Sequence, residues 1–445
     1  MKALQRDMTT GNPGKIILDF TFPIFLGNVF QQFYNMADTI IVGRFVGADA
    51  LAAVGATGII MFLLTGFAQG ITSGFSILTS QRYGAGDING VRRSVAGGVI
   101  LSVASAVVLT LLSLMSMKPL LHFMNTPADI FREAYTYIMV ISAGVVTGIF
   151  YNLFSAFLRA VGNSRVPLFF LIFSSCLNIV LDLTFILCFD MGTRGAALAT
   201  VVAQAVSAIL CGGYIYMKVP FLTPSAGMWK LNRHDTGLQL SMGIPMGFQF
   251  AITAFGGIVM QSAINLFGTV AVAAYTAAGK LESLAEQGMV AIGQAVAVYG
   301  GQNFGKGDYK RIREGVRAAL VAETTYGILA ALCMCGILEP ALRIFLAGEV
   351  ELSAMVPWAW TYTRICTAFF IPLSAIFVFR NIMQGCGYGF LPMAGGIVEM
   401  AARLLMAFAA IEMKSYAAAC FCHPAAWTSA AVFLGAAYLW IMLRR

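Results

Sequence analysis

The sequence is poor in charged residues. They make up 11% of the 445 residues while hydrophobic residues make up 59%, against roughly 25% and 45–50% in soluble domains. Mean hydropathy is +0.80. A soluble core cannot account for so many apolar side chains, so this composition excludes an ordinary soluble protein and predicts an integral membrane protein.

Patterns typical of metal sites and disulfide frameworks are also missing. The chain has three histidines, and neither Cys333-x-Cys335 nor Cys420-x-Cys422-His423 is joined by a second ligand cluster at zinc spacing. The nine cysteines lie in or beside apolar segments, where a free thiol behaves as a small hydrophobic group. We therefore expect no metal site, no disulfide framework and no cofactor.

The chain contains one half-protein twice. Residues 80–87, Ser-Gln-Arg-Tyr-Gly-Ala-Gly-Asp, return 221 residues later at 301–308 as Gly-Gln-Asn-Phe-Gly-Lys-Gly-Asp. Near the end of each half, Arg-Ala-Val-Gly at 159–162 returns as Gln-Gly-Cys-Gly at 384–387. Repeats in the same orientation are a common architecture of membrane transporters, with the site between or inside the halves.

Twelve segments are apolar and long enough to span a membrane, six in each half. Their approximate limits are 16–42, 51–79, 95–117, 132–157, 167–189, 195–217, 238–266, 271–299, 316–338, 356–383, 391–411 and 419–442. The first, seventh and tenth are long and contain Pro23, Pro245 and Pro372. We expect these three to be tilted or kinked.

The predicted fold is therefore all-α, with twelve transmembrane helices in two six-helix bundles. The bundles are residues 1–217 and 238–445, joined by a polar cytoplasmic linker at 218–237 that contains Pro220 and Pro224. A linker of this length would let the bundles move relative to each other, as alternating access requires.

Lysine and arginine collect in the connections that follow even-numbered spans. With the N-terminus inside, the cytoplasmic basic residues are Lys2, Arg6, Lys15, Arg82, Arg92, Arg93, Arg159, Arg165, Lys218, Lys230, Arg233, Lys306, Lys310, Arg311, Arg313, Arg444 and Arg445. Because cytoplasmic loops are enriched in these residues, both termini are predicted to be cytoplasmic and the protein to lie in the plasma membrane. The net charge of +8 then reflects this bias and gives no reason to expect a nucleic-acid partner.

Ionisable residues inside apolar segments are costly and are therefore candidates for function. Asp38 lies deep in the first span, with no basic residue within a helical turn. Asn178 and Asp182 lie four residues apart in the fifth span, so they face the same side of that helix. The corresponding positions of the second half carry no acid. Asn178 could alternatively bridge helices in a purely structural role.

Two further pairs in the second half share this spacing. Glu399 and Arg403 in the eleventh span are expected to neutralise each other as an intrahelical ion pair. Glu282 and Glu286 in the eighth span could form a substrate or cation site. Alternatively, Glu282 could simply pair with Lys280.

The acidic residues of the first half suit coupling to a cation. Two carboxyl groups close together in a low-dielectric bundle cannot comfortably both ionise, so one could load and release a proton near neutral pH. The same carboxylate, amide and hydroxyl oxygens could instead hold a dehydrated Na⁺. The residues leave the choice between H⁺ and Na⁺ open.

Methionine and phenylalanine are plentiful, at 23 and 34 residues. An adaptable cavity for flat apolar ligands could be lined by Phe248, Gln249, Phe250, Met260 and Met289, because methionine surfaces favour promiscuous binding. Ordinary bundle packing is the alternative for each of them.

The order and spacing of these features resemble the multidrug and toxic compound extrusion (MATE) family, DinF-type branch. The features are the duplicated twelve-span layout, the two Gln-x-x-Gly-x-Gly-Asp loops, Arg159-Ala-Val-Gly-x4-Pro167, Gln384-Gly-Cys-Gly-x4-Pro392 and Asp38-Thr39-Ile40. The resemblance covers essentially the whole chain. It implies a V-shaped pair of six-helix lobes related by a pseudo-two-fold axis along the membrane normal. It also implies antiport of organic, often cationic compounds against H⁺ or Na⁺. Nothing in the chain requires more than a monomer in the bilayer.

The resemblance also implies a cation site in the first half. Its residues would be Asp38, Tyr137, Asn178, Asp182 and Thr200. The family's first-span proline, linked to bending when the aspartate is protonated, falls on Pro23. Branches with a glutamate in the seventh span and an aspartate in the tenth have no counterpart here, so a cation site of that type is not expected in the second half.

Two other interpretations stay open. A flippase for a lipid-linked precursor would share the repeated bundles, although such proteins usually have more spans and a strongly cationic cavity. Gly84-x-Gly86-Asp87 and Gly305-x-Gly307-Asp308 match a pattern of intramembrane aspartyl proteases, whose chemistry needs two facing aspartates in the membrane. In cytoplasmic connections the same residues would instead end one helix and cap the next.

Overall fold

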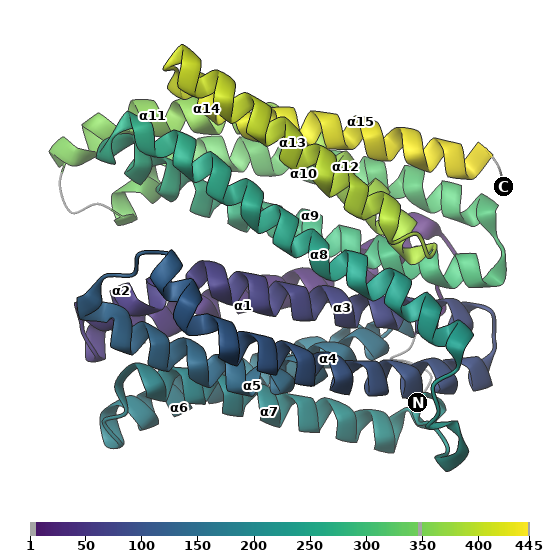
Figure 1. The fold of residues 1–445 in the computed structure, drawn as a ribbon. Coiled ribbons are helices and arrows are strands. Elements are labelled where there is room, and N and C mark those ends of the chain that lie inside the picture. Colours follow the sequence, from purple (N-terminus) through teal and green to yellow (C-terminus); the bar gives the residue numbers. More distant parts are fainter. Residues whose placement is uncertain (1–5, 346–348, 444–445) are drawn as a thin grey trace. The chain divides into compact units, whose positions relative to one another are not determined.

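The computed structural model describes residues 6–345 and 349–443, and over these residues the chain is helical with no β-strand (Figure 1). Lys2, Arg444 and Arg445, counted above among the cytoplasmic basic residues, lie outside the described residues. The helices are α1 (Pro13–Phe45), α2 (Ala48–Ala56), α3 (Gly58–Gly84), α4 (Ile88–Phe123), α5 (Ala128–Ala160), α6 (Arg165–Leu183), α7 (Gly192–Lys218), α8 (Arg233–Ile264), α9 (Thr269–Lys306), α10 (Tyr309–Phe345), α11 (Glu349–Thr367), α12 (Phe370–Gly385), α13 (Phe390–Met413), α14 (Tyr416–Cys420) and α15 (Cys422–Leu443).

Most of the predicted spans correspond to one long apolar helix. Among the described residues, ten helical segments are long and apolar enough to cross a membrane, and the bent pair α11 and α12 brings the number to eleven. The eighth predicted span, α9, is not among them. Its middle carries Lys280, Glu282 and Glu286, so its burial depends on neighbouring helices rather than on its own hydropathy.

Two predicted spans are interrupted. The second begins as the short helix α2 and continues as α3 after Thr57. The tenth, expected to be tilted or kinked, is divided into α11 and α12, which meet at an angle of 48°. Pro23 and Pro245 lie inside the continuous helices α1 and α8.

The two duplicated loops are built as helix connections. Gly86 and Gly307 have φ values of 74° and 78°, a left-handed conformation that glycine adopts without steric cost. The Asp87 carboxylate accepts a hydrogen bond from the Gly90 amide at 2.8 Å, and Asp308 accepts one from the Arg311 amide at 3.0 Å. Both aspartates therefore cap the start of the next helix, as the alternative to the protease interpretation predicted.

The structure contains two compact units. Among the described residues, unit 1 comprises Arg6, Asp7 and Leu26–Phe250, and unit 2 comprises Met8–Phe25 and the residues from Ala251 onward. The division of the sequence at 217 and 238 stays a prediction. The two units do not follow the predicted division at two helices. Helix α1 begins in unit 2 and ends in unit 1, and helix α8 begins in unit 1 and ends in unit 2.

Each unit is a layered helical bundle. In unit 1, α5 packs against α3, α4 and α7, and α6 packs against α7. In unit 2, α9 packs against α10, α11 and α12, and α13 packs against α15 (Figure 1). Small residues permit the closest approaches: Gly70 and Gly74 of α3 face the backbone of α8 at Met246 and Gly243, where a side chain would clash.

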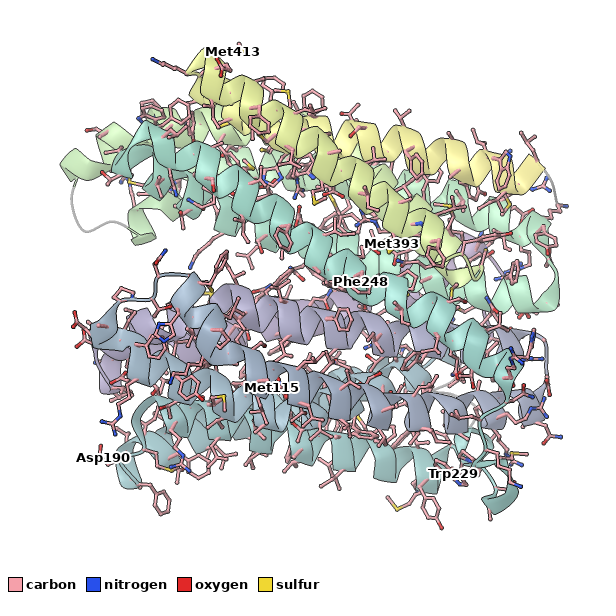
Figure 2. The ribbon with its side chains drawn as sticks, viewed as in Figure 1. Met115, Asp190, Trp229, Phe248, Met393 and Met413 are labelled. Atoms are coloured by element: carbon pink, nitrogen blue, oxygen red, sulfur yellow. The ribbon has the colours of Figure 1, made fainter. Side chains whose placement is uncertain are left out.

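Large apolar side chains cover the outer surfaces of both units. Met115 of α4 is 79% exposed and Met413 of α13 is 67% exposed (Figure 2). Exposed apolar surface on this scale would be unfavourable in water and marks contact with lipid or a partner. This surface agrees with the integral membrane protein that the composition predicts.

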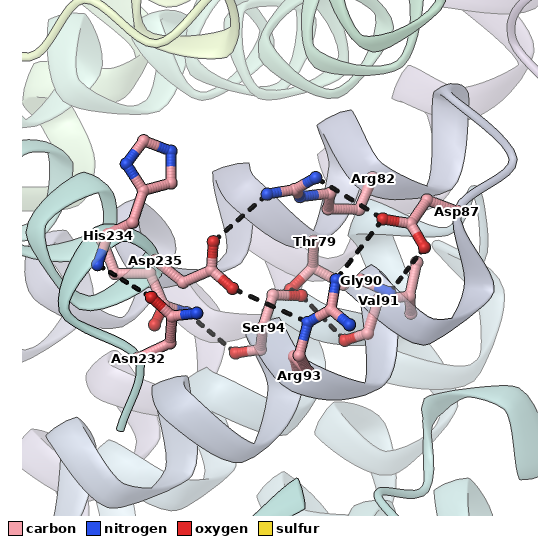
Figure 3. A network of polar contacts seen from close by, with 11 residues as sticks. Thr79, Arg82, Asp87, Gly90, Val91, Arg93, Ser94, Asn232, His234 and Asp235 are labelled. Atoms are coloured by element: carbon pink, nitrogen blue, oxygen red, sulfur yellow. Dashed lines mark hydrogen bonds and ion pairs between the residues drawn. The ribbon is translucent and has the colours of Figure 1, made fainter. Parts of the chain in front are cut away.

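The linker at 218–237 is ordered against unit 1. Its first short helix, Pro220–Leu222, packs against α4 and α7, and Leu222 is buried. A network of charges then fixes the start of α8 (Figure 3). Asp235 accepts a hydrogen bond from Arg82 at 3.1 Å and lies 3.9 Å from Arg93, while Arg82 also pairs with Asp87 at 3.4 Å.

Replacing Asp235 by Asn is expected to destabilise the protein by about 1 kcal/mol, because the two arginines lose their shared carboxylate in a partly exposed site. The thermal unfolding midpoint in detergent measures this loss. Asp129→Asn is the matched control, because Asp129 is also in the first turn of a helix and is exposed with no recorded ion pair. Equal midpoints for the two variants would show that the arginine contacts contribute nothing.

Candidate functional site

The polar residues predicted for the first half lie in four helices of unit 1. Asn178 and Asp182 in α6 are 1% and 0% exposed, Tyr137 in α5 is 4% exposed and Thr200 in α7 is 6% exposed. Asp38 in α1 is half-buried. The i,i+4 spacing places both α6 residues on the buried face, as predicted.

Hydrogen bonds connect these helices. The Thr200 hydroxyl donates to the Ala196 carbonyl at 3.2 Å within α7. It also lies 3.4 Å from the Tyr34 hydroxyl of α1 and 3.5 Å from the Asn178 amide of α6, both of which donate to it. Thr200 therefore joins three helices that contribute to the candidate site.

The two acids of the site lie close together. Asp38 and Asp182 are within electrostatic and hydrogen-bonding range of each other, and both act electrostatically on Tyr137. Two carboxyl groups this close in a buried site cannot comfortably both be charged. The geometry thus describes a carboxyl pair that can gain or lose a proton, or exchange it for another cation.

The backbone beside the pair is irregular. Directly after Asp182 and Leu183, α6 continues as one turn of π-helix over Thr184–Cys188. Such π-helical turns are rare and are frequent at functional sites. The π-helical turn therefore begins two residues after Asp182, next to the candidate site.

Sequence reasoning missed Tyr34. Its hydroxyl contacts Thr200, and it lies one helical turn before Asp38 on α1. A polar residue four positions from an intramembrane acid shares its helix face, and this signal could have identified it.

In unit 2, the hydrogen-bond partner of Glu282 is Tyr362, whereas Lys280 is the partner considered from the sequence. The Glu282 side chain is 5% exposed and accepts a hydrogen bond from the Tyr362 hydroxyl of α11. Tyr275 packs edge-on against the Tyr362 ring, with centroids 5.2 Å apart. Lys280 is exposed, and the described residues show no ion pair between it and Glu282. The Lys280 interpretation is therefore wrong, because the buried face of α9 turns Glu282 toward α11.

The predicted ion pair between Glu399 and Arg403 is confirmed, and a second arginine, Arg380, also pairs with Glu399. Their charged groups lie 2.7 Å apart on α13, and Arg380 of α12 lies 3.0 Å from the other oxygen of Glu399. All three side chains are at most 14% exposed. Two arginines thus share one buried carboxylate, and the second arginine comes from another helix.

The remaining candidates lie in different surroundings. Phe248 is 49% exposed and packs against Phe67 within unit 1, where Gln249 is buried (Figure 2). Met260 and Met289 are both fully buried in the apolar core of unit 2. Glu286 is half-buried and lies within electrostatic range of Glu282.

The described residues contain no metal-binding cluster. Over residues 6–345 and 349–443, no group of three or more histidine, cysteine, aspartate or glutamate side chains could hold a metal ion. The two acids of unit 1 are joined by amide and hydroxyl groups instead. This donor set suits a proton or a monovalent cation.

Comparison with known proteins identifies related chains. A family model described as MatE matches residues 23–184 and 245–409. The probable multidrug resistance protein YpnP of Bacillus subtilis is 32% identical over 309 residues, which cover 69% of this chain and 68% of that protein. The multidrug export protein MepA of Staphylococcus saprophyticus is 22% identical, with 84% of this chain and 82% of that protein covered.

Solved structures share the fold. A MOP superfamily transporter from Pyrococcus furiosus superimposes with a TM-score of 0.91 at 21% identity, covering 98% of this chain and 97% of that one. The outward-facing conformation of a multidrug resistance MATE family transporter gives a TM-score of 0.90 at 21% identity, covering 100% and 98% of the two chains. At this identity the likeness shows the fold alone.

Proposed function

The chain belongs to the MatE family, the multidrug and toxic compound extrusion transporters, and from this premise we propose that it exports organic compounds in exchange for protons. The choice of the proton is supported by the closeness of the Asp38 and Asp182 carboxyl groups in a buried site, where both cannot comfortably be charged. Its relatives named for multidrug resistance and multidrug export support organic substrates. Because the family consists of transporters, the protease interpretation is wrong.

The mechanism follows from charge balance at the carboxyl pair. A proton held between Asp38 and Asp182 leaves the pair with one negative charge, and its loss leaves two charges that repel each other in a low-dielectric site. A cationic substrate relieves this repulsion, so substrate and proton compete for the pair. Asn178, Thr200 and Tyr34 would hold the three helices α1, α6 and α7 in register during the exchange.

Helix α1 could transmit the exchange. Asp38 lies in the part of α1 that belongs to unit 1, while Pro23 lies two residues before that helix leaves unit 2 at Phe25. A proline inside a helix removes one backbone hydrogen bond and weakens the helix there. We infer that Pro23 is the hinge at which α1 bends as Asp38 changes its charge.

We place the protein in the cell membrane with both termini cytoplasmic, following the distribution of lysine and arginine. The lipid bilayer and small organic molecules are its partners, a monomer is sufficient, and the coupling ion takes the place of a cofactor.

The ion is tested in proteoliposomes with ethidium as the transported organic cation. We expect an imposed proton gradient to drive ethidium transport and an equal sodium gradient to leave it at the rate of empty liposomes. Transport driven by sodium alone would refute proton coupling while leaving antiport intact. Failure under both gradients would refute antiport of this cation.

The second half offers a further prediction. If Glu282 and Glu286 form a substrate or cation site, Glu282→Gln should slow gradient-driven ethidium transport by about 5–150-fold, the range of a coupling free energy of 1–3 kcal/mol. Glu286→Gln should act in the same direction. Glu412→Gln is the control, because Glu412 is exposed at the end of α13. Normal transport by both α9 variants would exclude the site.

A further inference from the structure

The mechanism above leaves one buried acid of unit 2 without a role. Glu323 of α10 is 0% exposed, and neither oxygen of its carboxyl group has a hydrogen-bond partner among the described residues. Sequence reasoning missed it, although it lies within the ninth predicted span. An unpaired acid at such a place is energetically costly and is therefore a candidate for function.

The surroundings of Glu323 are known from its neighbours. Helix α10 packs against α9, α11 and α12. Ser374 of α12 donates a hydrogen bond to the backbone carbonyl of Glu323 at 3.1 Å, and its hydroxyl lies 3.9 Å from the sulfur of Met289 in α9. One turn away, the Tyr326 hydroxyl donates to the Ala285 carbonyl at 3.0 Å. The hydroxyl groups of Ser374 and Tyr326 are therefore already engaged.

Among the described residues, no ion pair involves Glu323, and neither of its carboxyl oxygens has a hydrogen-bond partner. A buried carboxylate with no counter-charge would cost several kcal/mol. The group avoids that cost by carrying a proton.

The donor set decides which ligand the site can take. A metal cation needs several oxygen ligands in place of its water, whereas the groups around Glu323 supply a thioether and hydroxyls that already donate elsewhere. An organic cation would need an open space, and Glu323, Phe370 and Ser374 are all at most 1% exposed. A proton is the ligand that fits.

The site adjoins the broken span. Phe370 and Ser374 lie in the first two turns of α12, directly after the 48° bend that separates it from α11. Gly327 of α10 lies close to both residues. A Cβ atom added to this glycine would lie 2.8 Å from the Ser374 hydroxyl and 3.6 Å from the Phe370 carbonyl. Discontinuous helices form the ion sites of many transporters.

The internal repeat shows that the acid is specific to the second half. With the spacing of 221 residues, Glu323 corresponds to Ser102 of α4, which is also fully buried. The same position thus carries a small neutral group in one copy and an ionisable group in the other. The carboxyl group is not a requirement of the shared fold.

We propose that Glu323 is a second proton-binding site of this protein, in unit 2, which exchanges its proton during transport. This proposal rests on the proposed proton-coupled function. It adds one exchangeable proton to the one shared by Asp38 and Asp182, and it places the exchange beside the break between α11 and α12.

Infrared absorption of the purified protein tests proton binding independently of transport, because a protonated carboxyl group has its own C=O stretching band. Glu323→Gln is expected to lose one such band relative to wild type. Glu339→Gln, in an exposed position of the same helix, should lose none. Glu323→Asp keeps a carboxyl group and should show the band at a shifted frequency. If the glutamine variant does not fold, this shift still shows whether the side chain at position 323 binds a proton.

The exchange is measured as protons moved per ethidium in proteoliposomes. The expected result is a lower ratio for Glu323→Gln than for wild type and Glu339→Gln. An unchanged spectrum or an unchanged ratio would overturn the proposal. Absence of proton-driven transport by wild type would instead refute the proposed function, and the infrared bands would still decide whether Glu323 binds a proton.

Discussion

Replacing either acid of the unit 1 site by asparagine is expected to abolish most proton-driven export. Asp182→Asn and Asp38→Asn each keep the shape of the side chain but leave a single carboxyl group, so the pair can no longer exchange a shared proton for a cation. Loss of a coupling free energy of about 1–3 kcal/mol lowers gradient-driven ethidium accumulation by about 5–150-fold. Initial rates in proteoliposomes under a fixed proton gradient measure the effect.

The matched control is Asp190→Asn. Asp190 is exposed just beyond the π-helical turn that follows Asp182 (Figure 2), and its φ of 50° is a conformation that asparagine also tolerates. This variant should transport at the wild-type rate. If Asp182→Asn and Asp38→Asn also transport at that rate, the carboxyl pair does not couple transport to protons.

Glu399→Gln is expected to be the most destabilising of the conservative substitutions considered. It leaves Arg380 and Arg403 facing each other in a nearly dry site without their shared counter-charge. Breaking a buried ion pair by removing one partner costs about 3–5 kcal/mol, which corresponds to a fall of roughly 6–20 °C in the unfolding midpoint. Thermal unfolding in detergent measures it.

Glu412→Gln controls for the removal of a negative charge from α13, because Glu412 lies exposed on the same helix. Its midpoint should stay within about 2 °C of wild type, as for most surface substitutions. A Glu399→Gln midpoint equally close to wild type would mean that the two arginines do not depend on this carboxylate.

The sequence predicted features that depend on one helix at a time. Asn178 and Asp182 share a buried face of α6, and Glu399 pairs with Arg403 on α13, because positions four residues apart meet on any α-helix. The helix-capping role of Asp87 and Asp308 also followed from local spacing. The internal repeat and the hydropathy pattern together predicted the helical membrane fold.

Contacts between helices could not be predicted in the same way. Arg380 reaches Glu399 from α12, and Tyr362 reaches Glu282 from α11. Such partners depend on how helices rotate and pack, which the period of a single segment does not determine. Glu323 was missed although the signal that marked Asp38, an acid within an apolar span, was also present in the sequence at this position.

The claim that the Asp38 and Asp182 pair exchanges a proton for substrate is tested most directly by proton release. Ethidium is added to purified protein in weakly buffered detergent solution, and a pH-sensitive dye reports the protons released. Wild type and Asp190→Asn should release protons on binding, and Asp182→Asn should release at least one fewer per protein. Equal release by wild type and Asp182→Asn would contradict the mechanism.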